Sequence, residues 1–283
     1  MKNSCKPLKS AFVGTSLALA ALAAPLAQAG IVTQWQVTVD SKFDASSIVW
    51  RFGSSGTTVS DLDLRWGTPS PSTGPQSGAS ISNSPVDSVV NTNGPAVGNI
   101  FVSHLNNPIL AGTPRPEQFA IKSTLTLTPL VPSLPGLPAV TQSFTVFFEE
   151  TPNSPDNGIC ANGEANNQGI NINGCGDIFV IDRDALNFGF TYDTGDNIDQ
   201  QYFISFFELT SGLNPLPAAA CNYVLGPGGS PCLGFVTAEE TTTRVQFASV
   251  ITTKEVSIVP EPDSLALVGL SLGLFGLLRR RKA

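Results

Sequence analysis

Charged side chains and histidine are scarce in this sequence. Charged residues make up 13% of the 283 positions, and His104 is the only histidine. Glycine and proline are abundant, at 26 and 22 residues, and no segment between the two ends keeps the apolar spacing of an amphipathic helix. A helical bundle is therefore not expected, and any histidine-based triad would have to use His104. Because 41% of the residues are hydrophobic, the chain can still bury a substantial core.

Basic residues are nearly missing from the body of the chain. Residues 30–263 contain eight basic and 22 acidic side chains, a surplus of 14 negative charges. Such a body repels phosphate backbones, so nucleic acid is not an expected partner. The glycine-rich patterns of nucleotide-binding loops are absent as well.

Apolar and polar residues alternate with period two along the body. Trp35, Val37 and Val39 share one face of a segment whose other face is polar. The same pattern predicts strands near 48–52, 61–66, 100–105, 119–128, 142–149, 177–181, 186–192, 201–208 and 243–252. We expect an all-β fold, an antiparallel β-sandwich or a jelly-roll-like arrangement, in a single domain over residues 30–258. Two stretches rich in Ser, Pro, Gly and Asn, Thr68–Asn99 and Pro129–Pro138, are predicted to be surface loops.

Residues 1–29 have the layout of a secretory signal peptide. Three lysines precede a short apolar run that ends in Ala27-Gln28-Ala29, so cleavage is expected between Ala29 and Gly30. The alternative, a retained membrane helix, needs about 20 apolar residues, and this run is shorter. We therefore expect the signal helix to be removed on export.

Residues 259–283 form a second sorting segment. Pro260-Glu261-Pro262 is followed by the apolar run Leu265–Leu278 and then by a basic tail made of Arg279, Arg280, Arg281 and Lys282. Fourteen helical residues span about 21 Å, less than the ~30 Å hydrocarbon core of a bilayer. A short transmembrane helix with a cytoplasmic basic stop suits a transient hold in the membrane. The alternative is a plain C-terminal anchor.

This tripartite end closely resembles the PEP-CTERM sorting signal. The resemblance implies that an exosortase-type enzyme recognises and cleaves the tail. It also implies export in a Gram-negative bacterium that makes exopolysaccharide, with an inner-membrane intermediate and a final place at the cell surface or in the extracellular matrix. The same signal occurs on proteins of many functions, so it indicates a route and not an activity.

Five body segments resemble the THxN family of PEP-CTERM exported proteins. Ser103-His104-Leu105-Asn106 resembles the family's Thr-His-x-Asn signature, with serine in place of threonine. The other segments are Glu150–Asn153, Asp177–Val180, Cys232–Phe235 and Val245–Ala248. The family implies export and surface placement and has no established activity to carry over.

The cysteines fit an exported protein. Cys5 leaves with the signal peptide, and the four that remain predict two disulfides with three connectivities. We favour the local pairs Cys160–Cys175 and Cys221–Cys232, because each brackets a loop rich in Gly, Asn or Pro. Zinc is the alternative, but the spacing lacks C-x-x-C and the histidine is distant.

His104 and Asn106 are the candidate binding residues of the body. Two positions apart on a strand, their side chains share a face, as in a binding site or a pair that orders the loop at Asn107-Pro108. No catalytic residue is assigned. The adjacent pairs Glu149-Glu150 and Glu239-Glu240 point to opposite faces of a strand, so neither pair can flank one glycosidic bond. A glycosidase built from distant carboxylates stays open.

No cofactor is assigned, and calcium is the metal considered. Asp193, Asp196 and Asp199 crowd one turn, and hard oxygen ligands in exported loops are what calcium requires. The alternative is an Asx turn, in which such side chains bond their own backbone.

The sequence thus predicts a non-enzymatic, exported surface or matrix protein with a structural or interaction role, associated with exopolysaccharide or biofilm. The alternative is a secreted carbohydrate-binding module or carbohydrate-active enzyme. Convergence of several polar side chains in one cleft would favour that alternative.

Overall fold

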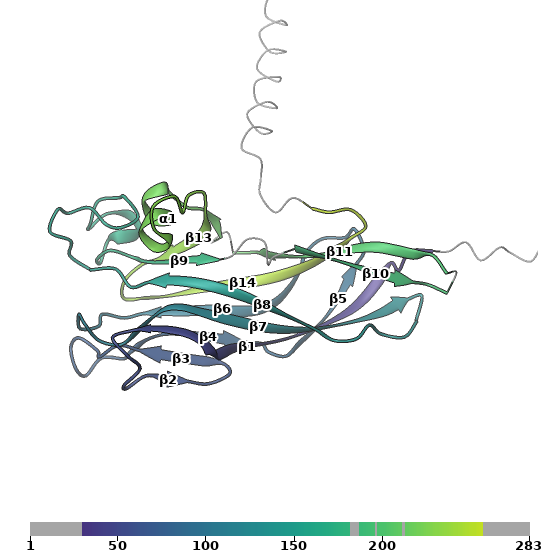
Figure 1. Cartoon of the computed structure of the whole chain (residues 1–283), viewed down its shortest axis with the longest axis horizontal. Helices are drawn as coiled ribbons and strands as arrows, with labels where there is room; N and C mark the ends of the chain where they lie inside the picture. Colours follow the sequence, from purple (N-terminus) through teal and green to yellow (C-terminus); the bar gives the residue numbers. More distant parts are fainter. Residues whose placement is uncertain (1–29, 182–186, 196, 211–212, 257–283) are drawn as a thin grey trace, which may run out of the picture.

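The computed structural model describes residues 30–181, 187–195, 197–210 and 213–256. The predicted signal peptide and the sorting segment lie outside these residues. Within them, the strands form two antiparallel sheets that pack face to face and curl along the long axis of the molecule (Figure 1). The expected all-β antiparallel sandwich is confirmed.

The first sheet, sheet A, is built on two long strands that follow the predicted alternation. Its order is β12 (Asn214–Pro215), β13 (Leu233–Thr237), β9 (Asp177–Ile181), β8 (Val140–Glu149), β7 (Arg115–Val131), β1 (Gln34–Arg51) and β5 (Val86–Asn91). β1 and β7 pair over most of their lengths, from Gln34 opposite Val131 to Arg51 opposite Arg115.

The second sheet, sheet B, covers the first. Its order is β10 (Asn187–Asp193), β11 (Asp199–Glu208), β14 (Thr241–Thr252), β6 (Val97–Asn106), β4 (Ser77–Ser82), β3 (Asp63–Trp66) and β2 (Thr58–Val59). Each neighbouring pair of strands is antiparallel.

The core lies between the sheets and is rich in aromatic side chains. Trp35, Trp66, Tyr202, Phe119 and Phe148 are among its largest fully buried side chains. Trp35 meets the rings of three residues of sheet B, Phe190, Tyr192 and Tyr202, edge to face, with centroids 5.2–5.5 Å apart. Such contacts add to the area that each ring buries and hold the two sheets in one alignment.

The prediction of a surface loop over residues 68–99 is wrong in part. This stretch contains β4, β5 and the first residues of β6. β4 reads Ser-Gly-Ala-Ser-Ile-Ser, and its first residues are small and buried, so it lacks the large alternating side chains that identify a strand. Gly78 is required there, because a Cβ would lie 2.6 Å from the Leu64 carbonyl oxygen of the adjacent strand. The second predicted loop is shorter than expected, because β7 continues to Val131.

One helix, α1 (Ala218–Leu225), was not expected from the sequence. It begins after Pro217 with three alanines, which have the highest helix propensity, and ends at Gly226, whose φ is 85°. Eight residues are too few to show a clear helical period. A short 3-10 helix, Gly169–Asn171, lies in the loop before β9.

Two connections and the end of one strand meet at one end of the sandwich. The turn 238–240 carries the chain from β13 in sheet A to β14 in sheet B, the loop 150–176 joins β8 to β9, and β6 ends at Asn106. α1 and the loop before β9 lie at this same end (Figure 1). The candidate site forms where these connections converge.

Candidate functional site

Three carboxylic acids from distant parts of the chain meet inside this end of the sandwich. Glu150, Asp177 and Glu239 each bring an oxygen within 4.8 Å of the others. Glu150 is 8% exposed, and Asp177 and Glu239 are fully buried. We call these three residues the acid cluster.

Each adjacent glutamate pair contributes one member to the cluster. Glu149 is the last residue of β8 and pairs with Arg51 at 3.1 Å, whereas the next residue, Glu150, turns inward. Glu239 points inward from the β13–β14 turn, whereas Glu240 is exposed at a positive φ of 59°. The two members of each pair point in opposite directions, as predicted, but Glu239 and Glu240 lie in a turn and not on a strand. The prediction also missed that one glutamate of each pair would meet the other.

His104 and Asn106 lie beside the acid cluster. Both point inward from β6, as their spacing predicts, and are 3% and 0% exposed. Both bond Thr237 of β13: His104 Nδ1 is 2.9 Å from the Thr237 hydroxyl, and the Asn106 amide nitrogen donates to the Thr237 carbonyl at 3.1 Å. The two residues therefore bond the opposite sheet and not the loop at Asn107-Pro108.

Aromatic rings surround the side chain of His104. Trp66 stacks on the imidazole at 5.7 Å with an interplanar angle of 13°, and Phe148 and Phe179 meet it at 5.5 and 4.7 Å. The Trp66 indole nitrogen also donates to Glu150 Oε2 at 3.0 Å. Rings and carboxylates are thus packed together with little access to water.

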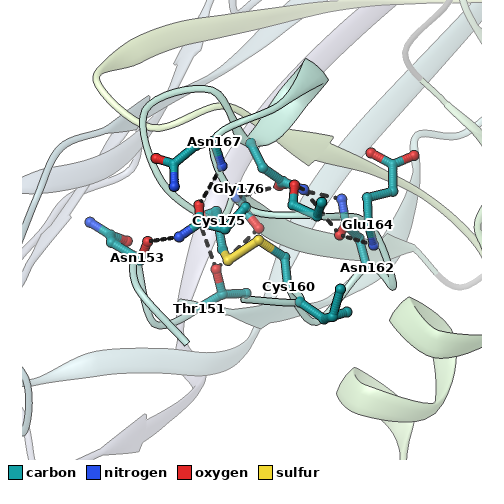
Figure 2. Close-up of a disulfide and its surroundings, with 12 residues drawn as sticks. Thr151, Asn153, Cys160, Asn162, Glu164, Asn167, Cys175 and Gly176 are labelled. Carbon is teal, nitrogen blue, oxygen red and sulfur yellow. Dashed lines mark hydrogen bonds between the residues drawn. A yellow bond between two sulfur atoms is a disulfide. The ribbon is translucent and has the colours of Figure 1, made fainter. Parts of the chain in front are cut away.

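The first disulfide supports the cluster from the loop side. Cys160 and Cys175 are bonded, with Cα atoms 5.3 Å apart. Thr151 donates its hydroxyl to the Cys175 carbonyl at 2.9 Å and its backbone N–H to Asp177 Oδ1 at 2.8 Å. Figure 2 shows Thr151 directly beside this disulfide. The loop that the bond closes is therefore tied to the start of β9, where Asp177 stands.

Asparagine side chains hold the rest of this loop. Asn171 is fully buried, and its amide oxygen accepts the Gly176 N–H at 3.0 Å. Asn162 is 4% exposed and lies against Asn171, with amide contacts of 3.3 and 3.4 Å. The abundance of asparagine in this segment is explained by bonds within the loop.

Burial dominates the electrostatics of the site. It raises the pKa of Glu150 to about 8 and that of Asp177 well above its ordinary value, and in both cases the neighbouring carboxylates add to the effect. Burial also raises the pKa of Glu239 to about 7, against the opposing influence of the nearby Asn106 and Asn153 side chains. The pKa of His104 falls to about 3 because of burial, so the imidazole is neutral at physiological pH.

The bonds of Thr237 define the tautomer of His104. The Thr237 hydroxyl donates to the Asp177 carbonyl at 3.4 Å, so it accepts from His104 Nδ1–H. His104 Nε2 is then a bare acceptor, 3.9 Å from Asp177 Oδ2. The Asn106 nitrogen donates to the Thr237 carbonyl, and its Oδ1 has no hydrogen-bond partner.

A surface pocket of about 280 Å³ leads to one edge of the cluster. Glu150 lines it together with Thr151, Pro152 and Asn153 on one side and Ile109 to Ala111 and Arg115 on the other. Asp177, Glu239 and His104 lie behind this lining. The pocket therefore reaches Glu150 and stops short of the other two acids.

The predicted calcium turn lies elsewhere, at the β10–β11 hairpin. Asp193 stands opposite Asp199, and its Oδ1 accepts the N–H groups of Gly195 and Asn197 at 2.8 and 3.1 Å. This is the Asx-turn arrangement that was the alternative to calcium. Asp196 lies outside the described residues.

The second disulfide joins Cys221 of α1 to Cys232, with Cα atoms 5.7 Å apart. Both bonds are the local pairs that the sequence favours. The four cysteines of the described residues are all in disulfides, so none of these four is a thiolate that could bind zinc.

Sequence reasoning missed the acid cluster, although a signal for it was present. Three of the five segments that resemble the THxN family supply residues to this site. The segment with the Thr-His-x-Asn signature carries His104 and Asn106. The segments Glu150–Asn153 and Asp177–Val180 carry Glu150 and Asp177. Glu239 belongs to none of these segments. Charge alone could not identify it, because its neighbour Glu240 is an ordinary exposed acid.

Comparison with known proteins identifies the C-terminal segment. The family description "PEP-CTERM protein-sorting motif" matches residues 259–282. The chain carries a PEP-CTERM sorting motif. As a PEP-CTERM protein it is exported through the membrane and sorted by an exosortase. No curated protein matches the chain, and the THxN resemblance stays a prediction.

The PEP-CTERM motif lies outside the described residues, as do the Pro260-Glu261-Pro262 sequence, the apolar run and the basic tail. Among the described residues, no helix has the length and apolar character needed to cross a membrane. The signal-peptide cleavage between Ala29 and Gly30 stays a prediction, since the described residues begin at Gly30.

Proposed function

We propose that this PEP-CTERM protein is a non-enzymatic component of the cell surface or extracellular matrix of a Gram-negative bacterium. It has a structural or interaction role and associates with exopolysaccharide. The resemblance to the THxN family is part of this proposal, because three of its segments converge on one buried site.

The observation that carries the non-enzymatic role is the closure of the acid cluster. A glycosidase needs two carboxyl groups on either side of a sugar, about 5–9.5 Å apart and open to substrate. Here the oxygens lie within 4.8 Å of one another, and Asp177 and Glu239 are fully buried. A sugar ring does not fit between them, so the polar residues converge inside the protein and not in an open cleft.

A polar sheet face supports association with a polysaccharide. Thr124 and Thr126 of β7 lie on the outward side of sheet A, and register places Thr126 opposite Thr38 of β1 and Thr124 opposite Thr141 of β8. Gln36 and Thr128 extend the row along the same pair of strands. Hydroxyl and amide groups at strand spacing offer hydrogen bonds to sugar hydroxyls, and the exposed carboxylates of Asp40 and Asp87 beside the row add acceptors.

The test uses the gene in its native host. A deletion strain is complemented with the wild-type gene or with a Thr124→Val/Thr126→Val variant, which keeps shape and removes two hydroxyls. Thr191→Val, on the exposed side of β10 in the other sheet, is the matched control. We expect the deletion to reduce cell aggregation and matrix polysaccharide, the double variant to lower the matrix-bound fraction of the protein several-fold, and Thr191→Val to behave as wild type.

The enzymatic alternative is tested with the purified surface protein and host exopolysaccharide. We expect no release of reducing ends or unsaturated sugars. Steady release that scales with protein concentration would overturn the non-enzymatic role. An unchanged matrix in the deletion strain would overturn the association with exopolysaccharide.

A further inference from the structure

The acid cluster holds more potential negative charge than its protein surroundings balance. The Lys and Arg ion pairs among the described residues involve Asp44, Asp63, Glu117 and Glu149, and none of them reaches the cluster. His104 is neutral. A buried carboxylate without a positive partner is strongly unfavourable, so the site needs either bound protons or a bound cation.

The spacing of the acids fits a single cation. Oxygens that bind calcium lie 2.3–2.6 Å from it, so two ligands of one ion are at most about 5 Å apart. The three acids each offer an oxygen within 4.8 Å of the others. A point between them therefore lies within about 2.8 Å of all three, so a small inward shift brings each oxygen to bonding distance.

A second observation, independent of the acids, points to the same ligand. Asn106 is fully buried. Its amide nitrogen donates to the Thr237 carbonyl, whereas its Oδ1 has no hydrogen-bond partner. His104 Nε2, Asp177 Oδ2 and both oxygens of Glu239 are also without partners. Every one of these unpartnered atoms is an acceptor. Water or a neutral donor would leave most of them unsatisfied, whereas a cation satisfies acceptors from several sides at once.

We propose that Glu150, Asp177 and Glu239 bind one calcium ion. Carboxylate and amide oxygens are the hard ligands that calcium prefers. Zinc prefers nitrogen and sulfur, and the four cysteines of the body are bonded in disulfides. The ion would join the end of β8 and the start of β9 in sheet A to the turn that crosses to β14 of sheet B, so it would close this end of the sandwich.

The pocket beside Glu150 provides a route for the ion. Glu150 lines its inner side, so a cation that enters from solvent meets this carboxylate first. Arg115 lines the same pocket. The site is distinct from the Asp193–Asp199 turn at the β10–β11 hairpin, and it does not depend on any role in the matrix.

The first experiment needs no variant. Mature protein purified from the exporting host is treated with chelator, dialysed, and supplied with calcium. We expect one equivalent of calcium per chain by elemental analysis, and a rise in Tm of about 5–10 °C at a calcium concentration 100-fold above Kd. Terbium, a luminescent substitute for calcium, should be sensitised by Trp66, whose indole nitrogen is 3.0 Å from Glu150.

Two pairs of variants locate the ion. Glu239→Gln keeps the shape of the side chain and removes its charge, so calcium affinity should fall at least about tenfold, whereas exposed Glu240→Gln should leave it unchanged. Trp66→Phe should lower terbium luminescence several-fold, whereas Trp50→Phe should not. If Glu239→Gln does not fold, the terbium pair still decides the location.

Three results would overturn the proposal. The first is wild-type protein that retains no calcium and whose Tm does not respond to it, which would mean that the acids hold protons instead. The second is binding of zinc in place of calcium. The third is calcium binding that is lost in Asp199→Asn and kept in Glu239→Gln, which would place the ion at the hairpin.

Discussion

His104 Nδ1 lies 2.9 Å from the hydroxyl of Thr237, although 133 positions separate the two residues in the sequence. His104 belongs to β6 in sheet B and Thr237 to β13 in sheet A, so this bond joins the two sheets inside the sandwich. Thr237 also donates to the Asp177 carbonyl and accepts from Asn106, which makes it the common partner of the candidate site.

Thr237→Val should destabilise the protein by about 1–3 kcal/mol. Valine keeps the shape of threonine but leaves the buried His104 N–H without an acceptor, and the full desolvation cost of that group is then felt. Urea unfolding of purified protein in chelator measures the effect. Thr191→Val, an exposed threonine on β10, is the control and should change the free energy of unfolding by less than about 0.5 kcal/mol. Equal effects in the two variants would contradict this role of Thr237.

Trp66→Phe should lower the free energy of unfolding by about 2–4 kcal/mol, because it removes the N–H that bonds Glu150 and part of a fully buried ring. Trp50→Phe is the comparison, since Trp50 is only partly buried. Both are measured by chemical denaturation with matched protein batches. If Trp50→Phe lost more stability than Trp66→Phe, the result would contradict the larger contribution expected of Trp66.

The two disulfides should have similar effects on stability and different effects on the site. They close loops of 15 and 11 residues, so loss of either should cost about 3 kcal/mol in the chain-entropy model. Only the Cys160–Cys175 bond holds the loop that bonds Asp177 through Thr151.

Double serine variants test this difference. The Cys160→Ser/Cys175→Ser variant should weaken calcium binding as well as stability, whereas Cys221→Ser/Cys232→Ser should lower stability alone. Isothermal titration with calcium, together with urea unfolding, separates the two effects. Equal loss of calcium affinity in both variants would contradict a specific link between the first disulfide and the acid cluster.

Gly234→Ala should be strongly destabilising, by more than about 2 kcal/mol. A Cβ at this position in β13 would clash with the backbone carbonyl of Phe179 on the adjacent strand, and backbone cannot move aside as a side chain can. Gly189→Ala in β10 is the matched control, because the nearest atom there is the flexible amide end of Gln201 at 2.8 Å. Thermal unfolding of both variants checks the order, and a more stable Gly234→Ala than Gly189→Ala would contradict it.

The sequence predicted the sandwich well where burial is one-sided. Trp35, Val37 and Val39 alternate with polar residues because one face of β1 meets the core and the other meets solvent. The same reasoning placed His104 and Asn106 on one face of a strand, and in the structure this face is buried. It failed for β4, whose buried residues are small, and for α1, which is too short to show a helical period.

The acid cluster could not be predicted from local pattern. Its members stand at positions 150, 177 and 239, one after a strand, one at the start of a strand and one in a turn. Their approach depends on β8, β9 and β13 being neighbours in sheet A, and on the β13–β14 turn crossing to sheet B. Strand order is a property of the whole fold, so the local alternation of residues gave no sign that these three acids would meet.

The intact mass of the protein recovered from the surface of its native host tests the central claim, that this is an exported protein sorted through its C-terminal segment. The claim predicts a chain that begins near Gly30 and stops near Pro260-Glu261-Pro262, with or without an added group at the new end. Surface protein that still carries Arg279 to Ala283 would contradict it.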